Sequence, residues 1–325
     1  MQTLHSCKYT KKNLISHADI FDLLFCKKKR IFADCFKVKK MADTTKNIEI
    51  SERYIDLDKV IKSKSERLHR WLPKFVVRWV GRLLHVDELN YYIYKYRDKF
   101  GPEFAQAILA DLNITVEIVN PENMPTSANP MIVGNHPLGG VDGMALIAEV
   151  GRTRPDILFP VNDILLYLPG LRKSFVPINK FGTNTQNVQV LEEAFAGQNT
   201  LLYFPAGLCS RKRKGVIKDL EWKRTFVKKS VRYHRDVTPV FVDAHNSKRF
   251  YRWANIRKAL HIGFNFEQLL LPSEMFRLRN GKIRLVFGPT IPCSTFDKSR
   301  KPEEWAARVR DYVYTLNDNP NNKFE

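Results

Sequence analysis

The residues with the clearest chemical potential lie in the run NHPLGGVDG at positions 135–143. The run follows a short apolar stretch and precedes a helical one, so we expect it at the carboxyl end of a strand, where open α/β sheets place their sites. A histidine can accept a proton from a hydroxyl near neutral pH, and a nearby aspartate can fix its tautomer. His136 and Asp142 are therefore candidates for a general base and its orienting carboxylate, and Gly139 and Gly140 allow the turn between them. A second interpretation is that His136 caps a turn and Asp142 caps the next helix.

A second run, LLYFPAGLCSR at 201–211, is an apolar stretch that ends in a Pro/Gly loop and then a basic segment. Such a loop can bind a phosphate or carboxylate through Ser210, Arg211 and backbone N–H groups. Lys212–Lys214 are interpreted as a solvated basic loop. Arg211, next to Ser210 at the end of the expected strand, is the candidate for a functional cation.

The elements that must position these runs alternate from residue 114 onward between short β-branched stretches and helical stretches. This alternation is typical of an α/β domain with a mostly parallel central sheet flanked by helices. The expected strands are 115–119, 131–133, 157–161, 175–178, 200–204, 238–242 and 282–287, and the expected helices are 141–151, 185–197, 222–234, 247–261 and 302–316.

The segment before residue 114 has a helical pattern, with Pro73 expected in the first turn of its main helix. Trp71, Phe75 and Trp79 belong to an apolar stripe, and Arg78 lies among the cations of the opposite face. Such a helix suits a membrane interface, with Trp at headgroup depth and cations toward anionic lipid. The alternative is a helix whose apolar face packs on the following domain.

The chain is therefore expected to have three parts. Residues 1–40 look unlike the rest and are interpreted as a disordered or spurious N-terminal extension, with a basic membrane-binding arm as the alternative. Residues 41–113 are expected to form a helical membrane-interface segment. Residues 114–325 are expected to form the domain that carries both runs.

The composition limits which classes of partner the chain is expected to bind. A formal net charge of +20 indicates an anionic partner such as nucleic acid, an acidic lipid surface or a phosphorylated substrate. The five cysteines are odd in number and lack CxxC or Cys/His ligand spacing, so neither a disulfide framework nor a metal site is expected, and a reducing compartment fits best. No run reaches the ~18–20 apolar residues that span a bilayer.

The two runs together, in order and about 70 residues apart, resemble the blocks of the phospholipid/glycerol acyltransferase family, which contains the lysophosphatidate acyltransferases. The chain is more similar still to the bacterial hemolysin-like lysophospholipid acyltransferase subfamily, some members of which acylate amino-acid-based lipids. The resemblance covers roughly 114–292. Weaker matches to family blocks are 159–162 with 169–170, 175–178, 238–240 and 283–289.

Two departures from the family pattern concern the acceptor. Five residues separate His136 from Asp142, where the family has four, although the Gly-Gly subfamily shares this insertion. In the third block, usually Phe-Pro-Glu-Gly-Thr-Arg-Ser, Ala206 replaces the Glu and Cys209 stands in place of the Arg. Arg211 is the available cation, so a plain lysophosphatidate site is in doubt.

The resemblance implies an enzyme of membrane lipid biosynthesis without a cofactor, in which His136 takes the proton of a lysolipid hydroxyl as it attacks an acyl thioester. The donor would be acyl-carrier protein or acyl-CoA. The acceptor would be a lysophospholipid such as lysophosphatidate or, alternatively, an N-acylated amino-acid lipid of the lyso-ornithine or lyso-glycine type. Anionic membrane lipids are the expected partner, and the expected location is cytoplasmic, peripheral on the inner face of the cell membrane. The residues assigned to substrate binding are Asn135, Gly139, Gly140, Phe204, Pro205, Gly207, Ser210 and Arg211.

Two functions from other classes compete with this interpretation. The cations between 211 and 235 could grip a nucleic-acid backbone, but the chain has no helix-turn-helix signal, zinc spacing or aromatic RNA-binding block. A serine hydrolase would need a G-x-S-x-G elbow, which Gly207–Arg211 does not provide. We therefore expect neither nucleic-acid binding nor serine-dependent hydrolysis.

Overall fold

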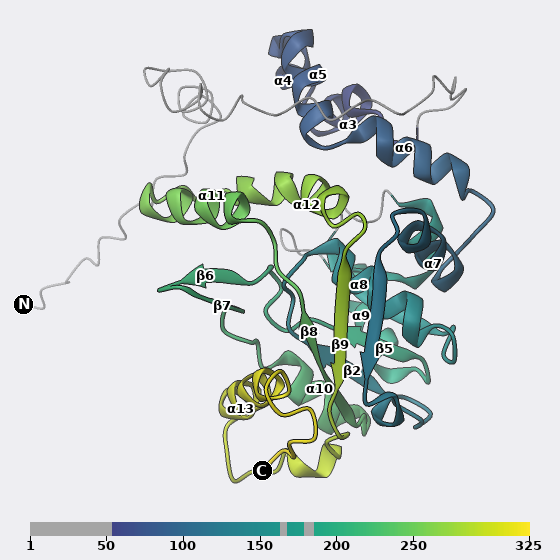
Figure 1. The fold of residues 1–325 in the computed structure, drawn as a ribbon, viewed down its shortest axis with the longest axis vertical. Helices are drawn as coiled ribbons and strands as arrows, with labels where there is room; N and C mark the ends of the chain where they lie inside the picture. Colours follow the sequence, from purple (N-terminus) through teal and green to yellow (C-terminus); the bar gives the residue numbers. More distant parts are fainter. Residues whose placement is uncertain (1–53, 163–167, 179–184) are drawn as a thin grey trace, which may run out of the picture. The chain divides into compact units, whose positions relative to one another are not determined.

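A seven-stranded sheet with the strand order β1-β9-β8-β2-β5-β3-β4 organises the chain (Figure 1). The computed structural model describes residues 54–162, 168–178 and 185–325, so the predictions for residues 1–40 and for the start of the 41–113 segment lie outside the described residues. The strands are β1 (Thr115–Val119), β2 (Met131–Gly134), β3 (Ile157–Asn162), β4 (Phe175–Ile178), β5 (Thr200–Tyr203), β8 (Val237–Asp243) and β9 (Lys282–Phe287).

Strand direction confirms the predicted mostly parallel sheet. The five consecutive strands β8, β2, β5, β3 and β4 run parallel to one another. β9 runs antiparallel to β8 and parallel to β1, so these two edge-side strands point the other way. Hydrophobic patterns do not record strand direction, which explains why the reversal at β9 was not predicted.

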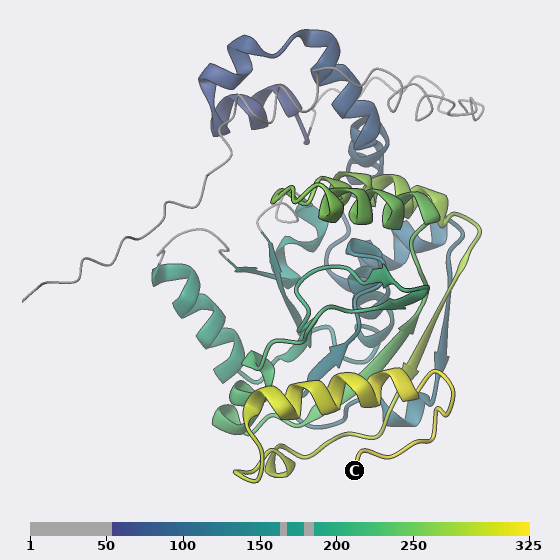
Figure 2. The same ribbon diagram turned by 90° about the vertical axis from the view of Figure 1, so that its left-hand side faces the viewer.

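Helices cover both faces of the sheet, and the strand alternation shows why. Met131 and Val133 point into one core cluster and Ile132 into the other, as the two-residue period of a strand requires. One cluster is completed by α7 (Pro102–Asp111) and α8 (Gly140–Val150), and the other by α9 (Thr185–Ala196), α10 (Thr225–Tyr233) and α13 (Pro302–Thr315). The helices α11 (Lys248–Ala259) and α12 (Leu271–Arg277) lie at the opposite end of the sheet from α13 (Figures 1 and 2).

The segment before β1 is helical, as predicted, but it is divided into short pieces. These are α3 (Leu57–Lys64), α4 (Glu66–Trp71), α5 (Lys74–Leu83) and α6 (Val86–Lys95). Pro73 directly precedes α5, where its missing N–H costs nothing, and it separates α5 from α4. No helix within the described residues is long and apolar enough to cross a bilayer.

The sequence patterns missed two small elements, α12 and a hairpin made of β6 (Arg211–Arg213) and β7 (Val216–Lys218). The hairpin occupies the stretch interpreted as a solvated basic loop. Arg213 and Lys214 are indeed exposed, but Arg211 is buried. Strands of three residues are too short to show a period, so only tertiary packing reveals them.

Candidate active site

The imidazole of His136 faces the carboxylate of Asp142. β2 ends two residues before His136, and the first turn of α8 carries Asp142. Nδ1 of His136 lies 3.0 Å from Oδ2 of Asp142, so the ring donates from Nδ1 and leaves the lone pair of Nε2 to accept a proton. Among the described residues no partner bonds to Nε2, and the side chain is 15% exposed, whereas Asp142 is fully buried. The geometry is that of a general base with its orienting carboxylate.

Asp142 also organises the turn that carries it. Its Oδ2 accepts the backbone N–H groups of Leu138 at 2.9 Å and Gly139 at 3.2 Å, and its Oδ1 accepts that of Gly143 at 2.8 Å. The same carboxylate therefore caps the first turn of α8 and holds the imidazole, so the two interpretations of this run do not exclude each other. A carboxylate fixed by several backbone donors cannot turn away from His136.

Gly139 is required by the shape of this turn. Its φ is +85°, and an added Cβ would lie 2.8 Å from Cδ1 of Leu271 and 3.1 Å from Sγ of Cys209. At Gly140, by contrast, an added Cβ would meet no atom within 4 Å. Gly139 thus serves packing, and Gly140 leaves open space beside the site.

Two carboxylates set the basicity of His136. Burial of the ring lowers its pKa, but the charge and hydrogen bond of Asp142, with a further contribution from the charge of Asp219, outweigh burial and raise the pKa above its ordinary value. A raised pKa makes the neutral imidazole a stronger base. It also means that the ring must lose its proton at a higher pH before it can act.

Asp219 is a buried residue of the site that the sequence analysis missed. Its carboxylate accepts the backbone N–H of His136 at 3.2 Å, the Ser210 hydroxyl at 2.6 Å and the Trp222 indole N–H at 2.9 Å. Burial raises the pKa of this carboxyl despite these bonds. Asp219 thus holds the backbone of His136 while Asp142 holds its ring. The one signal that could have indicated it is an aspartate three residues before a tryptophan in an otherwise basic stretch.

The loop after β5 packs directly against the loop that carries His136 and Asp142, which we call the catalytic loop after its expected role. The ring of Phe204 stacks on the imidazole of His136 with centroids 4.4 Å apart, and the Ser210 N–H donates to the His136 carbonyl at 2.8 Å. Gly207, with a φ of +63°, forms the turn, and its N–H donates to the Phe204 carbonyl. The buried Pro205 accepts a backbone hydrogen bond from Lys223. The structure therefore brings together the two runs singled out in the sequence.

Arg211 lies in a buried cluster of charges. Its guanidinium donates to Oε1 of Glu267 at 2.8 Å and to the Cys209 carbonyl at 2.6 Å. Glu267 is fully buried, and its other oxygen lies 2.9 Å from Nε of Arg257. Substrate binding by Ser210 and Arg211 stays a prediction, and in this structure both side chains are engaged inside the protein.

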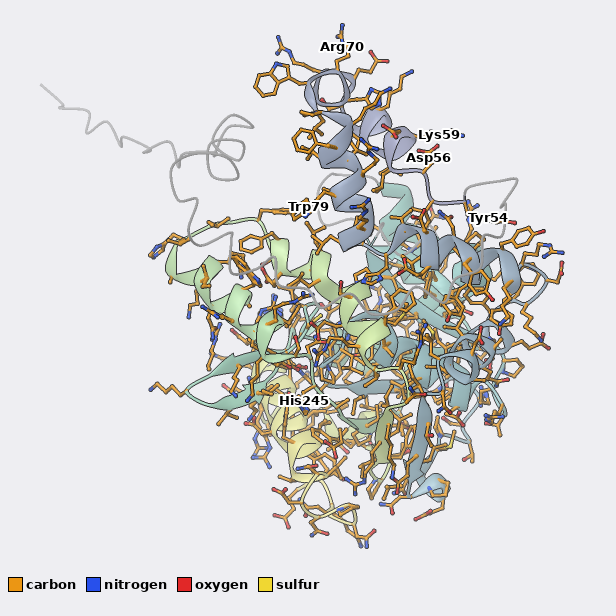
Figure 3. The ribbon with its side chains drawn as sticks, turned by 45° about the horizontal axis from the view of Figure 1, so that its top comes forward. Tyr54, Asp56, Lys59, Arg70, Trp79 and His245 are labelled. Carbon is orange, nitrogen blue, oxygen red and sulfur yellow. The ribbon has the colours of Figure 1, made fainter. Side chains whose placement is uncertain are left out.

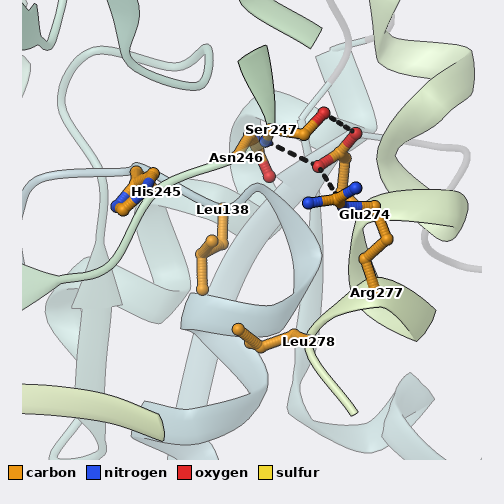
Figure 4. Close-up of a pocket in the computed structure, with 7 residues that line it drawn as sticks. All are labelled: Leu138, His245, Asn246, Ser247, Glu274, Arg277 and Leu278. Carbon is orange, nitrogen blue, oxygen red and sulfur yellow. Dashed lines mark hydrogen bonds and ion pairs between the residues drawn. The ribbon is translucent and has the colours of Figure 1, made fainter. Parts of the chain in front are cut away.

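On its other side the catalytic loop is held by the side chain of Asn135 and by residues that line a small pocket. The Asn135 side chain bonds to both backbone groups of Val242 in β8. The pocket, of about 100 Å³, is lined by Leu138 and by residues of the loop after β8 and of α12 (Figure 4). There Asn246 donates to the Pro137 carbonyl at 3.0 Å, and Glu274 accepts the N–H and hydroxyl of Ser247 at the start of α11. The catalytic loop is thus tied to α11 and α12.

The residues assigned to a membrane interface lie on α4 and α5, not on the loops that hold His136. Trp71, Phe75, Trp79 and Arg78 are all exposed. Figure 3 shows Arg70 and Trp79 on this helical segment. The buried face of α5 is narrow. Val77 is buried, and Leu83 packs against a small core that includes Phe250 and Tyr251 of α11. The assignment to a membrane interface stays a prediction.

Known proteins and one family model are similar to this chain. The model of a family described as "Acyltransferase" matches residues 59–321. Two proteins named lyso-glycine lipid O-acyltransferase, from Bacteroides thetaiotaomicron and Phocaeicola vulgatus, are each 43% identical to this chain over 264 residues, covering 81% of it and 97% and 95% of their own lengths. The crystal structure of the 1-acyl-sn-glycerophosphate acyltransferase from Thermotoga maritima matches with a TM-score of 0.42 and 18% identity, over 66% of this chain and 78% of that one. The family match and the identity to these relatives identify this chain as an enzyme that belongs to the acyltransferase family.

Proposed function

We propose that this enzyme transfers an acyl chain from an acyl thioester to the hydroxyl of a lyso-glycine lipid, a glycine that carries an N-linked 3-hydroxy fatty acid. The observation that carries the proposal is the His136–Asp142 pair, 3.0 Å apart, in a chain 43% identical to two lyso-glycine lipid O-acyltransferases. The pair supplies the base that the reaction needs, and the likeness points to the acceptor.

The proposed step needs only a positioned base. Nε2 of His136 takes the hydroxyl proton as the oxygen forms a bond to the thioester carbonyl carbon. The carbon–sulfur bond then breaks, and the leaving thiolate takes the proton back from the imidazolium. Asp142 stabilises that imidazolium during the step. A thioester is already activated, so positioning and base catalysis suffice, and no acyl-enzyme is formed.

The surroundings of Arg211 favour an acceptor without a phosphate. Arg211 is the cation available to replace the missing arginine of the third block. Glu267 already pairs with it at 2.8 Å, and both groups are buried. A dianionic phosphate would have to displace a buried carboxylate from this pair, which is costly. We therefore place a glycine lipid before lysophosphatidate as the acceptor.

We place the enzyme on the inner face of the cell membrane as a peripheral protein, with α4 and α5 as a membrane contact. The exposed Trp71, Phe75 and Trp79, with Arg78 beside them, support this placement, since Trp favours the headgroup region and cations favour anionic lipid. Acyl-carrier protein and acyl-CoA both remain donors compatible with the chemistry.

The test is an acyl-transfer assay with the purified full chain. Each donor is offered with N-(3-hydroxyacyl)glycine, with its ornithine analogue or with lysophosphatidate in matched detergent. We expect kcat/KM to be highest for the glycine lipid with at least one donor. Equal or faster turnover of lysophosphatidate would overturn the acceptor assignment, and no turnover of any hydroxyl acceptor would overturn the proposed function.

A further inference from the structure

Two neighbouring elements carry several cations each and contain no acidic residue. They are α11 with the loop that follows it to Phe266, and the β6–β7 hairpin. The two pack together, because Ile217 and Trp253 join the same small core and Arg211 lies over the Phe250 ring. We call this surface the α11–hairpin face. Three cations of this face are paired, Arg211 and Arg257 with Glu267, and Lys218 with Asp311. Seven others remain: Lys212, Arg213, Lys214, Lys248, Arg249, Arg252 and Lys258.

These cations differ from those of α10, which is also basic. On α10, Arg224 pairs with Glu303, and Lys229 and Arg232 face Glu192. On the α11–hairpin face none of the seven cations has an acidic partner within the part of the chain that the structure describes. The α11–hairpin face therefore carries a group of unpaired positive charges, which can attract an anionic partner.

Apolar side chains stand exposed at the tips of the same two elements. Val216 at the hairpin turn is 63% exposed, and Leu260 and Phe264 after α11 are 62% and 59% exposed. Two of them lie two residues after a lysine, Val216 after Lys214 and Leu260 after Lys258. Apolar tips set among cations are typical of surfaces that insert into the headgroup region of an anionic bilayer.

The geometry points to the α11–hairpin face as a second membrane contact, separate from α4 and α5, that docks on an anionic lipid bilayer. A bilayer accounts for both observations, since anionic headgroups attract the cations and the acyl boundary accepts the apolar tips. An acidic carrier protein would account for the cations but would leave the exposed apolar tips without a role. Docking here brings the lipid surface to the helix that is tied, through Asn246 and Pro137, to the catalytic loop.

The test is co-sedimentation of the full chain with phosphatidylcholine vesicles, with and without phosphatidylglycerol. One variant carries Arg213→Gln, Lys214→Gln and Arg252→Gln. Its matched control carries Lys298→Gln, Arg300→Gln and Lys301→Gln, which remove equal charge from the exposed loop before α13. We expect the first variant to bind anionic vesicles about 100-fold more weakly, at about fivefold per cation, and the control to change far less. Arg213→Gln alone gives the fivefold step in a minimally altered protein.

A second pair of variants tests the apolar tips. Leu260→Ser with Phe264→Ser should weaken vesicle binding even at high salt, whereas Val188→Ser, at an equally exposed valine of α9, should not. Equal losses in a variant and its control would overturn the proposal. It would also be overturned if vesicle binding were unchanged while binding to acyl-carrier protein was lost. Vesicle binding needs no acyl transfer, so a failure here is distinguishable from a failure of the proposed reaction, which detergent-dispersed acceptor measures.

Discussion

The loops after β2 and β5 end neighbouring parallel strands and stand out equally in the sequence, yet they use their polar groups in opposite ways. The first leaves Nε2 of its histidine without a partner among the described residues and supports the ring with Asp142. The second turns Ser210 and Arg211 inward, to Asp219 and Glu267. A motif can therefore leave a side chain with a free acceptor in one loop and bury its polar groups in the next, and we expect the first loop to carry the reaction and the second to support it.

The largest expected effect is the loss of the base in the first loop. His136→Ala should lower kcat for acyl transfer on the order of 10²–10⁴-fold, because no other group replaces the imidazole. The control is His245→Ala, which removes an exposed histidine from the loop after β8. Near-wild-type transfer by His136→Ala would mean that the first loop, too, is only scaffold.

The second loop is expected to respond in stability. Arg211→Gln should lower the free energy of unfolding by about 3–5 kcal/mol, because it leaves Glu267 buried with one partner fewer. The control Arg213→Gln, at an exposed cation two residues away, should change it by about 0.5 kcal/mol or less. In a Glu267→Gln background most of the Arg211→Gln effect on unfolding by urea should vanish. If Arg211→Gln instead spared stability and raised the KM for the acceptor, Arg211 would bind substrate.

The contribution of Asp142 should be visible in the pH dependence. We propose that neutral His136 is the active form, so kcat/KM should rise with pH through a pKa that Asp142 holds above the ordinary value. Asp142→Asn removes the carboxylate charge, so this pKa falls and the acidic limb moves to lower pH. The plateau rate should also drop, on the order of 10²-fold or more, because the tautomer is no longer fixed. Glu149→Gln, elsewhere on α8, is the control, and an acidic limb that stays in place in Asp142→Asn would contradict this role.

Asp219 should give the smallest effect, because it holds the backbone of His136 rather than its ring. Asp219→Asn should cost about 1–3 kcal/mol of stability through imperfect pairing of buried donors. It should also move the acidic limb of kcat/KM to lower pH by less than Asp142→Asn, since its charge contributes less to the pKa of His136. The matched control is Glu221→Gln, at an exposed site two residues away. A shift as large as that of Asp142→Asn would show that the two carboxylates do not differ in the way proposed.

Sequence patterns predicted the sheet and the first loop because both follow local rules. The strands of the sheet carry apolar runs, and 135–143 combines a histidine, glycines and an aspartate within one turn. The direction of β9 and the β6–β7 hairpin were not predicted, because antiparallel pairing with β8 and a three-residue strand leave no periodic trace.

The partners of the second loop were out of reach for a different reason. Glu267 lies 56 residues after Arg211, and the burial of Asp219 depends on the fold and leaves no local pattern. Whether a cation is free or neutralised depends on such long-range contacts. The sequence could therefore name Arg211 as a candidate but could not show that its charge is already compensated.

We propose that the protonation state of His136 controls acyl transfer. The direct test is to titrate the His136 imidazole by NMR in the full chain and to compare its pKa with that of the acidic limb of kcat/KM. We expect the two values to coincide, to lie above the ordinary histidine value, and to fall together in Asp142→Asn. A kinetic limb that departs from the titration of His136, or that persists unchanged when the titration moves, would contradict the account.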